Sequence, residues 1–225
     1  MRPELFEPPV MTFGITNAPD DFRGYITNTI RETLDEVTST NLDDDLIYRD
    51  PEEANKGHVL WIMQQLLVTG LYLKPETCDV SKDTVKYLGL IISTQGMYID
   101  EEKVGTVRNC CRRKKSVNGR LYNLFQAQQF LGFWNYYQHF ISEYYEEAAP
   151  LTRLTKQDEQ FASASEQQPA FEKMVTAFMT APVLQDFNHH REVIIETDAF
   201  NDVSAGVVTQ YPEVEVLHLV AYIWK

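Results

Sequence analysis

Two adjacent aspartates, Asp43 and Asp44, are the residues whose type and spacing could best do chemistry. They stand in residues 41–45, Asn-Leu-Asp-Asp-Asp, between a helix-like segment and the short apolar run 46–48. Carboxylates this close repel each other, and a divalent metal ion is the usual partner that offsets the charge. An acidic turn exposed to solvent is the alternative interpretation. Taken alone, the pair favours the acidic turn, and the surrounding segments change this balance.

The flanking segments predict the elements that position this pair. Asn17 or Thr16 can cap a helix that has Pro19 in its first turn. Apolar residues then recur at three- and four-residue spacing from Phe22 to Val37, which predicts one buried helical face. The run 46–48 is short and apolar enough for a strand, so we expect the aspartates at a hairpin turn, with side chains pointing into the same region.

A second helix and a second hairpin are predicted further on. Asp50 and Pro51 are typical of a helix start, and Gly70 of its end. The expected apolar face of this helix consists of Val59, Ile62, Met63, Leu66 and Leu67. Branched and aromatic residues over 84–93, followed by a turn at 94–96, predict a hairpin. This order of elements is typical of an α+β fold and excludes a helical bundle.

Beyond residue 100 the pattern predicts helices first and strands last. We expect one helix from Leu124 to Tyr145 with an aromatic core, a polar linker over 156–169, and a helix over 170–180. An aromatic stripe at helical spacing is more typical of packing than of base stacking. Three strand-like runs follow, near 192–198, 204–210 and 216–224.

The composition is that of a globular protein. The chain has 225 residues, of which 44% are hydrophobic, and no apolar run approaches the roughly 18 residues that span a bilayer. Neither a signal core nor a paired Cys-x-x-Cys or His-x-x-x-His spacing occurs, which disfavours secretion and a structural zinc site. We therefore expect a soluble intracellular protein, in the cytoplasm or the nucleus, with no membrane partner.

The charge distribution points in two directions. A net charge of −13 opposes nucleic-acid binding, which draws affinity from Lys and Arg on phosphates. One local cluster has the opposite sign and consists of Arg108, Arg112, Arg113, Lys114 and Lys115. It is either a nucleic-acid-binding patch or a solvated basic loop, and the sequence leaves both open.

An ordered series of short motifs resembles the Pol polyprotein of gypsy-type LTR retrotransposons. Residues 11–22, 40–48, 70–78 and 87–93 are similar to the palm of a reverse transcriptase, and residues 130–137, 149–156, 181–184 and 195–199 to later parts of the same polyprotein. The resemblance implies an α+β fold with three parts. These are a partial reverse transcriptase palm over 1–100, a thumb- or connection-like helical region over 101–160, and the first strands of an RNase H-like fold over 161–225.

The same resemblance implies RNA-directed DNA synthesis. Its partners would be an RNA template, a DNA primer and deoxynucleoside triphosphates. Asp43 and Asp44 would be the catalytic carboxylates that bind Mg²⁺ or Mn²⁺, and Asp198 would be a metal-binding carboxylate of the RNase H-like part. The residues implied to face nucleotide and template are Phe13, Gly14 and Asn41, and those implied to hold the primer are Tyr87, Leu88 and Gly89.

Several departures from the family lead us to expect an inactive chain. Asn41 stands where the family has tyrosine, Asp45 where it has an apolar residue, and residues 108–123 look like a damaged connector. The first palm aspartate and the later RNase H carboxylates would lie outside residues 1–225. We therefore expect weak metal binding and no polymerase activity from this chain alone, with other Pol segments as potential partners. The alternative is a non-enzymatic remnant that binds nucleic acid or protein.

Overall fold

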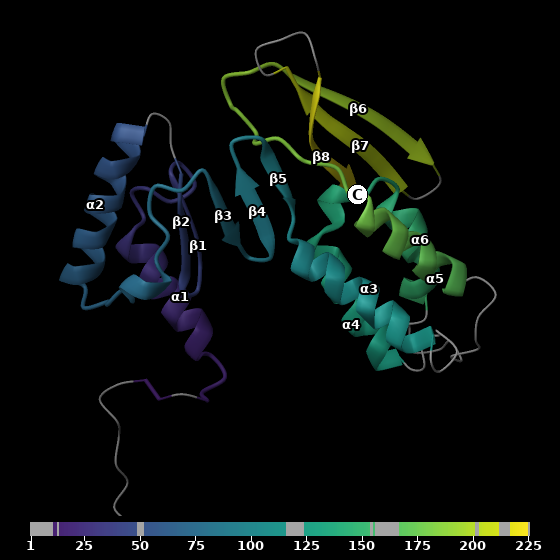
Figure 1. Cartoon of the computed structure of the whole chain (residues 1–225), viewed down its shortest axis with the longest axis horizontal. Coiled ribbons are helices and arrows are strands. Elements are labelled where there is room, and N and C mark those ends of the chain that lie inside the picture. Colours follow the sequence, from purple (N-terminus) through teal and green to yellow (C-terminus); the bar gives the residue numbers. More distant parts are fainter. Residues whose placement is uncertain are drawn as a thin grey trace, which may run out of the picture. The chain divides into compact units, whose positions relative to one another are not determined.

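The computed structural model describes residues 11–12, 14–48, 52–115, 124–153, 155, 167–200, 203–211 and 217–224. Side chains at 52–53, 109–115, 124–127, 167–168, 200 and 203 lie outside this description. The chain divides into two compact units, Met1–Lys82 and Asp83–Lys225, each mixing helices and antiparallel sheet (Figure 1). The α+β class is thus confirmed, whereas the division at residues 100 and 160 stays a prediction. No described helix has the length and apolar character to cross a membrane.

The first unit packs two helices with a two-stranded sheet. In chain order its elements are α1 (Ala18–Thr29), β1 (Thr38–Asn41), β2 (Asp44–Ile47), α2 (Glu52–Val68) and the short 3₁₀ helix η1 (Pro75–Thr77). Ile26 and Ile30 at the end of α1 meet Ile62 and Leu66 of α2 in a small buried core, and Ile47 of β2 packs against it. This core fixes the inner face of the hairpin.

Helix α1 begins as predicted but ends early. Asn17 occupies the N-cap position, although its side chain makes no capping hydrogen bond. The apolar periodicity extended to Val37, whereas the helix ends at Thr29, so that part of the prediction is wrong. Val37 is nevertheless buried, because the chain turns back onto the core through Asp35, which has φ +63°. In this segment the apolar spacing marks residues that are buried, and it does not mark a continuous helix.

Helix α2 buries a narrower stripe than the sequence predicted. Ile62 and Leu66, one turn apart, are buried, whereas Met63 and Leu67 are 37% and 66% exposed. The small unit offers one stripe of contacts, so the remaining apolar residues of α2 face outward. Gly70 ends the helix as predicted: it has φ +77°, and the Leu71 N–H donates to the Leu66 carbonyl in a Schellman arrangement. The predicted start at Asp50 and Pro51 lies outside the described residues.

The second unit opens with a three-stranded antiparallel sheet and continues with helices. The strands are β3 (Thr84–Tyr87), β4 (Leu90–Ser93) and β5 (Gly96–Ile99). The helices are α3 (Glu101–Lys115), α4 (Leu124–Tyr136), η2 (Gln138–Phe140), α5 (Tyr144–Arg153) and α6 (Gln167–Met179). Residues 108–115 of the stretch expected to be a damaged connector are helical, and residues 116–123 lie outside the described part. The damage to the connector stays a prediction.

The expected single helix over 124–145 is also wrong, because the chain breaks after Tyr136. Glu143, with φ +58°, precedes α5 and lets the chain change direction. The break allows α4, η2 and α5 to bury Trp134, Phe140 and Leu151 in one core with α6. The aromatic stripe serves packing, as predicted, since Trp134 is fully buried and its ring centroid lies 4.9 Å from that of Phe178.

After α6 the second unit contains another three-stranded antiparallel sheet, which confirms the three predicted strands. They are β6 (Val193–Phe200), β7 (Val203–Gln210) and β8 (His218–Trp224), paired in that order. The segment before β6 joins the two sheets of this unit. Leu184 exchanges backbone hydrogen bonds with Met97 of β5, and the Gln185 N–H donates to the Leu219 carbonyl of β8.

Candidate functional site

The aspartate pair lies at the tip of a tight hairpin, as predicted. Asn41 of β1 is paired with Asp44 of β2, so the turn contains only Leu42 and Asp43. Leu42 has φ +57° and is the only one of the two central residues with positive φ. Such two-residue turns match the twist of the strands they join. The hairpin therefore places Asp43 in the turn itself and Asp44 at the first position of β2.

The pairing register sends neighbouring carboxylates to opposite faces. Asp44 lies opposite Asn41, and Asp45 lies opposite Thr40. Because side chains alternate along a strand, Asp44 and Asp45 point to different faces of the sheet. Asp43 and Asp44 are exposed, whereas Asp45 is half-buried on the face that also carries Ile47. Two carboxylates are thus available to solvent, and the third is directed inward.

Asp45 lies in a poor environment for a charge. Burial raises the pKa of its carboxyl, and the charges of Asp44 and Asp43 raise it further, against an opposing effect of the Thr40 hydroxyl. That hydroxyl does not reach hydrogen-bonding geometry: Thr40 Oγ1 and Asp45 Oδ1 are both buried without a hydrogen-bond partner. Oγ1 of Thr38, on the same face, is also buried and unpaired. The inner face of the hairpin therefore holds unsatisfied polar atoms next to the apolar core.

The tip of the hairpin offers carboxylates of the kind that bind metal ions. Exposed carboxylates such as Asp43 and Asp44 suit a hard divalent cation. Within the described ranges, however, no group of three or more His, Cys, Asp or Glu residues is placed to hold a metal ion. The pair fits two ligand positions and does not complete a two-ion site.

The other residues expected near nucleotide and template are only partly placed. Asn41 is half-buried, and its Oδ1 accepts a long hydrogen bond of 3.5 Å from Nη2 of Arg23 on α1. Gly14 lies in an exposed turn with φ +92°. Phe13 lies outside the described residues. The structure thus brings Asn41 to the aspartate hairpin.

A second two-residue hairpin carries the residues expected at the primer. Tyr87 of β3 is paired with Leu90 of β4, which leaves Leu88 and Gly89 as the turn. Both have positive φ, +51° and +80°, as in the type I′ turns common in tight hairpins. A Cβ atom on Gly89 would lie 2.7 Å from the Tyr137 hydroxyl oxygen. The position therefore requires glycine for its backbone angle and for its close approach to α4 and η2.

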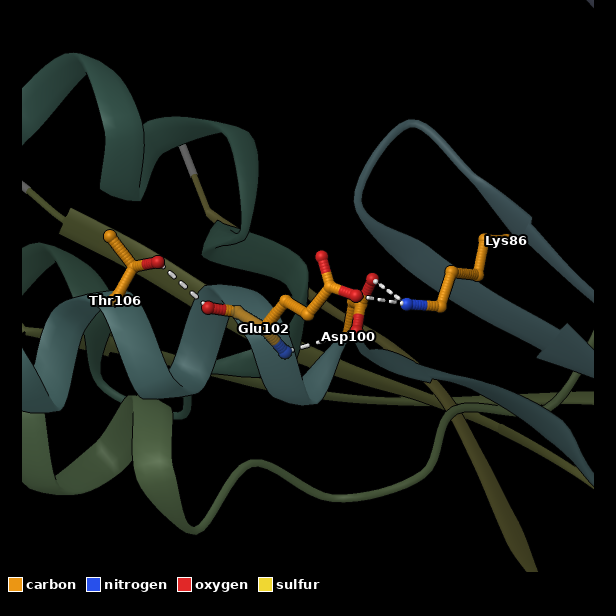
Figure 2. Close-up of polar contacts among 4 residues, drawn as sticks. All are labelled: Lys86, Asp100, Glu102 and Thr106. Atoms are coloured by element: carbon orange, nitrogen blue, oxygen red, sulfur yellow. Dashed lines mark hydrogen bonds and ion pairs between the residues drawn. The ribbon is translucent and has the colours of Figure 1, made fainter.

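A polar cluster that the sequence reasoning missed lies beside this turn (Figure 2). The buried Asp100 directly precedes α3, and its Oδ1 accepts the Glu102 N–H at 3.0 Å. Lys86 Nζ lies 3.1 Å from Asp100 Oδ2 and 2.7 Å from Glu102 Oε1. The Glu102 N–H and Lys86 hold the pKa of Asp100 below its usual value, whereas Glu102 and Asp100 raise the pKa of Lys86. An aspartate before Glu-Glu at a helix start is the signal that could have revealed the cluster.

The remaining candidate residues lie apart from these hairpins in the chain. Asp198 is exposed on β6, and its Oδ1 accepts the Ala199 N–H at 2.8 Å. Arg108 is exposed on α3. The side chains of Arg112, Arg113, Lys114 and Lys115 lie outside the described part, but their backbone is helical. The basic cluster therefore lies on a helix and not on a loop over residues 108–115, and its binding of nucleic acid stays a prediction.

Comparison with known proteins identifies the relatives of this chain. Residues 164–225 match the family model described as an RNase H-like domain found in reverse transcriptase. The transposon Tf2-3 and Tf2-7 polyproteins of Schizosaccharomyces pombe are each 29% identical to it over 204 residues. The chain is thus similar to the reverse transcriptase and RNase H region of retrotransposon Pol polyproteins. The alignments with the two polyproteins cover 91% of the chain but only 15% of each polyprotein.

Solved structures support the fold. The foamy viral protease-reverse transcriptase in complex with an RNA/DNA hybrid matches 96% of this chain with a TM-score of 0.71 and 18% identity, over 28% of the viral chain. The same viral protein in complex with double-stranded DNA matches 95% with a TM-score of 0.70, over 43% of that chain. At this identity the likeness concerns the fold.

Substitution of Asp45 tests the polar inner face of the hairpin. Because the folded state raises the pKa of Asp45, it disfavours the charged form, and the penalty is largest above the folded pKa. Asp45→Asn should therefore increase the free energy of unfolding at neutral pH by about 0.5–1 kcal/mol. The gain should shrink as the pH falls through the folded pKa towards the ordinary carboxyl value. Urea unfolding at several pH values measures it. Asp79→Asn, which changes an exposed carboxylate in the same unit, is the control, and equal gains would contradict the account.

Substitution of Gly89 tests the turn at Leu88–Gly89. Gly89→Ala should reduce the free energy of unfolding by about 2 kcal/mol, through its left-handed backbone and the contact with Tyr137. Gly105→Ala is the matched control, because Gly105 lies within α3 and a Cβ there meets no atom within 4 Å. It should raise stability by roughly 0.5–1 kcal/mol. Thermal unfolding followed by circular dichroism measures both changes. A neutral Gly89→Ala would show that the turn is not constrained in this way.

Proposed function

We propose that this chain is a segment of a Pol polyprotein and carries the catalytic carboxylate hairpin of a reverse transcriptase palm. Its function would be RNA-directed DNA synthesis within a longer polyprotein. The observation that carries the proposal is the two-residue turn at Leu42 and Asp43, which leaves Asp43 and Asp44 exposed side by side while Asp45 turns inward. A tight turn of this kind holds two carboxylates at a fixed spacing at the tip of a hairpin.

In this proposal Asp43 and Asp44 hold Mg²⁺ or Mn²⁺. Bound divalent ions would stabilise the charge that develops on the transferring phosphoryl group. The protein residues would bind and orient the nucleic acid and the nucleotide. Asn41 and Gly14, with Phe13, would face nucleotide and template, and the turn that follows Tyr87 would contact the primer. The partners are an RNA template, a DNA primer and deoxynucleoside triphosphates. Complexes of the foamy viral relatives with double-stranded DNA and with an RNA/DNA hybrid support duplex partners.

We further propose that residues 1–225 alone do not polymerise. The support is that the described residues present two exposed carboxylates at the hairpin and no group of three suited to a metal ion. Asp198 stands on β6 with its Oδ1 bonded to its neighbour's N–H. Other Pol segments would supply the missing ligands in the polyprotein. The proposed functional division into palm (1–100), thumb or connection (101–160) and RNase H-like part (161–225) follows from the same family.

A non-enzymatic nucleic-acid-binding segment is the second candidate. Its support is the run of five basic residues from Arg108 to Lys115 on the helix α3. A helix that carries these charges in two turns could follow a phosphate backbone, although the net charge of −13 opposes it. Under this candidate the exposed aspartates would repel nucleic acid rather than serve chemistry.

Primer extension tests the polymerase proposal. Extension of a DNA primer on an RNA template should be absent for residues 1–225 and present for the polyprotein that contains them. Asp43→Asn combined with Asp44→Asn should reduce the polyprotein's rate by more than about a hundredfold, because metal ligands are lost. Asp35→Asn should leave the rate unchanged. Equal extension by the double variant and the unmodified polyprotein would exclude these aspartates as catalytic residues.

Duplex binding separates the two candidates. Fluorescence anisotropy of a labelled RNA/DNA hybrid measures binding by residues 1–225. For a binding segment, replacing both Arg112 and Arg113 by Glu should weaken affinity more than about tenfold at low salt. Each lost phosphate contact removes the favourable release of a counterion from the nucleic acid. The Asp43→Asn and Asp44→Asn variant should bind as well or better. Unchanged affinity after charge reversal would exclude the basic helix as the binding surface.

A further inference from the structure

We infer that Asp100 is a positioning residue that fixes the turn at Leu88 and Gly89 against the start of α3. The effect of this positioning on primer binding rests on the proposed function, because that proposal assigns the turn to the primer. Asp100 belongs to neither hairpin strand of the turn and follows it by eleven residues in sequence. Its contacts nevertheless converge on both arms of the turn.

The backbone of Asp100 holds one side of the turn. The Asp100 N–H donates to the Gly89 carbonyl at 3.1 Å, directly after the two left-handed residues. The Asp100 carbonyl in turn accepts from the Lys103 and Val104 N–H groups, at 2.8 and 3.1 Å. One residue therefore connects the carbonyl of the turn to the first turn of α3. A shift of the helix start would move Gly89 with it.

The carboxylate of Asp100 holds the other arm. Oδ1 caps α3 through the Glu102 N–H, and Oδ2 pairs with Lys86, the residue immediately before Tyr87 (Figure 2). Asp100 is 6% exposed, so this pair is better shielded from water than the pair of Lys86 with the exposed Glu102. Shielded pairs are less screened than surface pairs. Lys86 on β3 and Gly89 after it are thus tied to the same residue.

Two tyrosines close the remaining side of the turn. The Tyr137 hydroxyl lies against Gly89, where a Cβ atom would meet it at 2.7 Å. Burial raises the pKa of Tyr137 to about 12, and the nearby Asp100 charge contributes to the rise. Burial raises the pKa of Tyr136 as well, and the nearby Tyr87 adds to the rise. The Asp100 carboxylate, the turn and the end of α4 therefore form one cluster, in which the turn has little freedom to move.

Residue-resolved hydrogen exchange of the whole chain tests the inference. Asp100→Asn keeps an oxygen for the cap and the backbone N–H but loses the charge that pairs with Lys86, and Lys86→Met removes the pair from the other side. Either change should accelerate amide exchange at Tyr87, Leu90 and Asp100 about fivefold. The double variant should accelerate it no further than Lys86→Met alone, because Lys86→Met already removes the pair with Asp100 together with the pair with Glu102. Exchange at the Ile194–Thr209 pair of β6 and β7 is the reference within the same unit.

The controls distinguish a positioning role from general stability. Lys173→Met, which removes an exposed lysine of α6, should leave exchange at the turn unchanged. Unchanged exchange at Tyr87 and Leu90 in both test variants would overturn the inference. So would an equal acceleration at the Ile194–Thr209 pair, because the whole unit would then be opening.

A binding measurement separates this inference from the proposed function. Affinity for a labelled RNA/DNA hybrid is measured by anisotropy with the same variants. A looser turn with a severalfold loss of affinity supports both the positioning role and the contact with the primer. A looser turn with unchanged affinity leaves the positioning role standing and removes the primer assignment. An unaltered turn overturns the positioning role whatever the affinity does.

Discussion

Two tight turns with left-handed backbone are the constraint on which the candidate residues depend. Leu42 in one hairpin and Leu88 with Gly89 in the other have positive φ, and each hairpin reverses within two residues. A left-handed non-glycine residue costs about 1–2 kcal/mol, so the surrounding structure must stabilise it. Ile47 anchors the first hairpin in the core of its unit, and Asp100 with Tyr137 encloses the second. Packing, rather than turn propensity, maintains both conformations.

The length of the first turn decides which aspartate reaches solvent. Because the turn contains two residues, Asn41 pairs with Asp44 and Thr40 pairs with Asp45. The carboxylates of Asp44 and Asp45 therefore point to opposite faces of the sheet. A slip of one residue would exchange their roles, burying Asp44 and exposing Asp45. The buried unpaired oxygen of Asp45 weakens the present register, because a charge there lacks a partner. The chain thus carries an electrostatic cost next to the residues on which its proposed chemistry depends.

Local signals predicted the parts of the fold that depend on neighbouring residues. Gly70 as a helix stop, the aspartates at a hairpin turn and the three strands after residue 190 follow from turn chemistry and alternation, and the structure confirms them. The predictions failed where burial and backbone geometry diverge. The apolar spacing from Phe22 to Val37 continues through a change of direction. In the segment 124–145 the aromatic spacing likewise continues past the break after Tyr136, and Glu143, with positive φ, changes the direction of the chain before α5.

The cluster around Asp100 illustrates a different limit. Its N-cap position could be read from the sequence, but its pairing with Lys86 and its bond to Gly89 depend on how β3, β4 and β5 fold back. Those contacts join residues 11 to 14 positions apart and have no spacing signature. The position of the aspartate pair at a hairpin turn, by contrast, was predicted from neighbouring residues, and the structure confirms it. The roles of the candidate residues are predictions from the resemblance to the family, and the position of Asp43 and Asp44 at the tip of a hairpin supports them.

Paramagnetic line broadening by Mn²⁺ tests the central claim most directly. On titration of Mn²⁺ into the labelled chain, the account predicts that amide signals of residues 41–44 broaden first, at millimolar concentrations that reflect an incomplete ligand set. The same signals should stay sharp when Asp43 and Asp44 are both replaced by Asn. Broadening that begins elsewhere, or that persists at the hairpin in the double variant, would contradict the claim that these two carboxylates form the metal-binding tip of a polymerase palm.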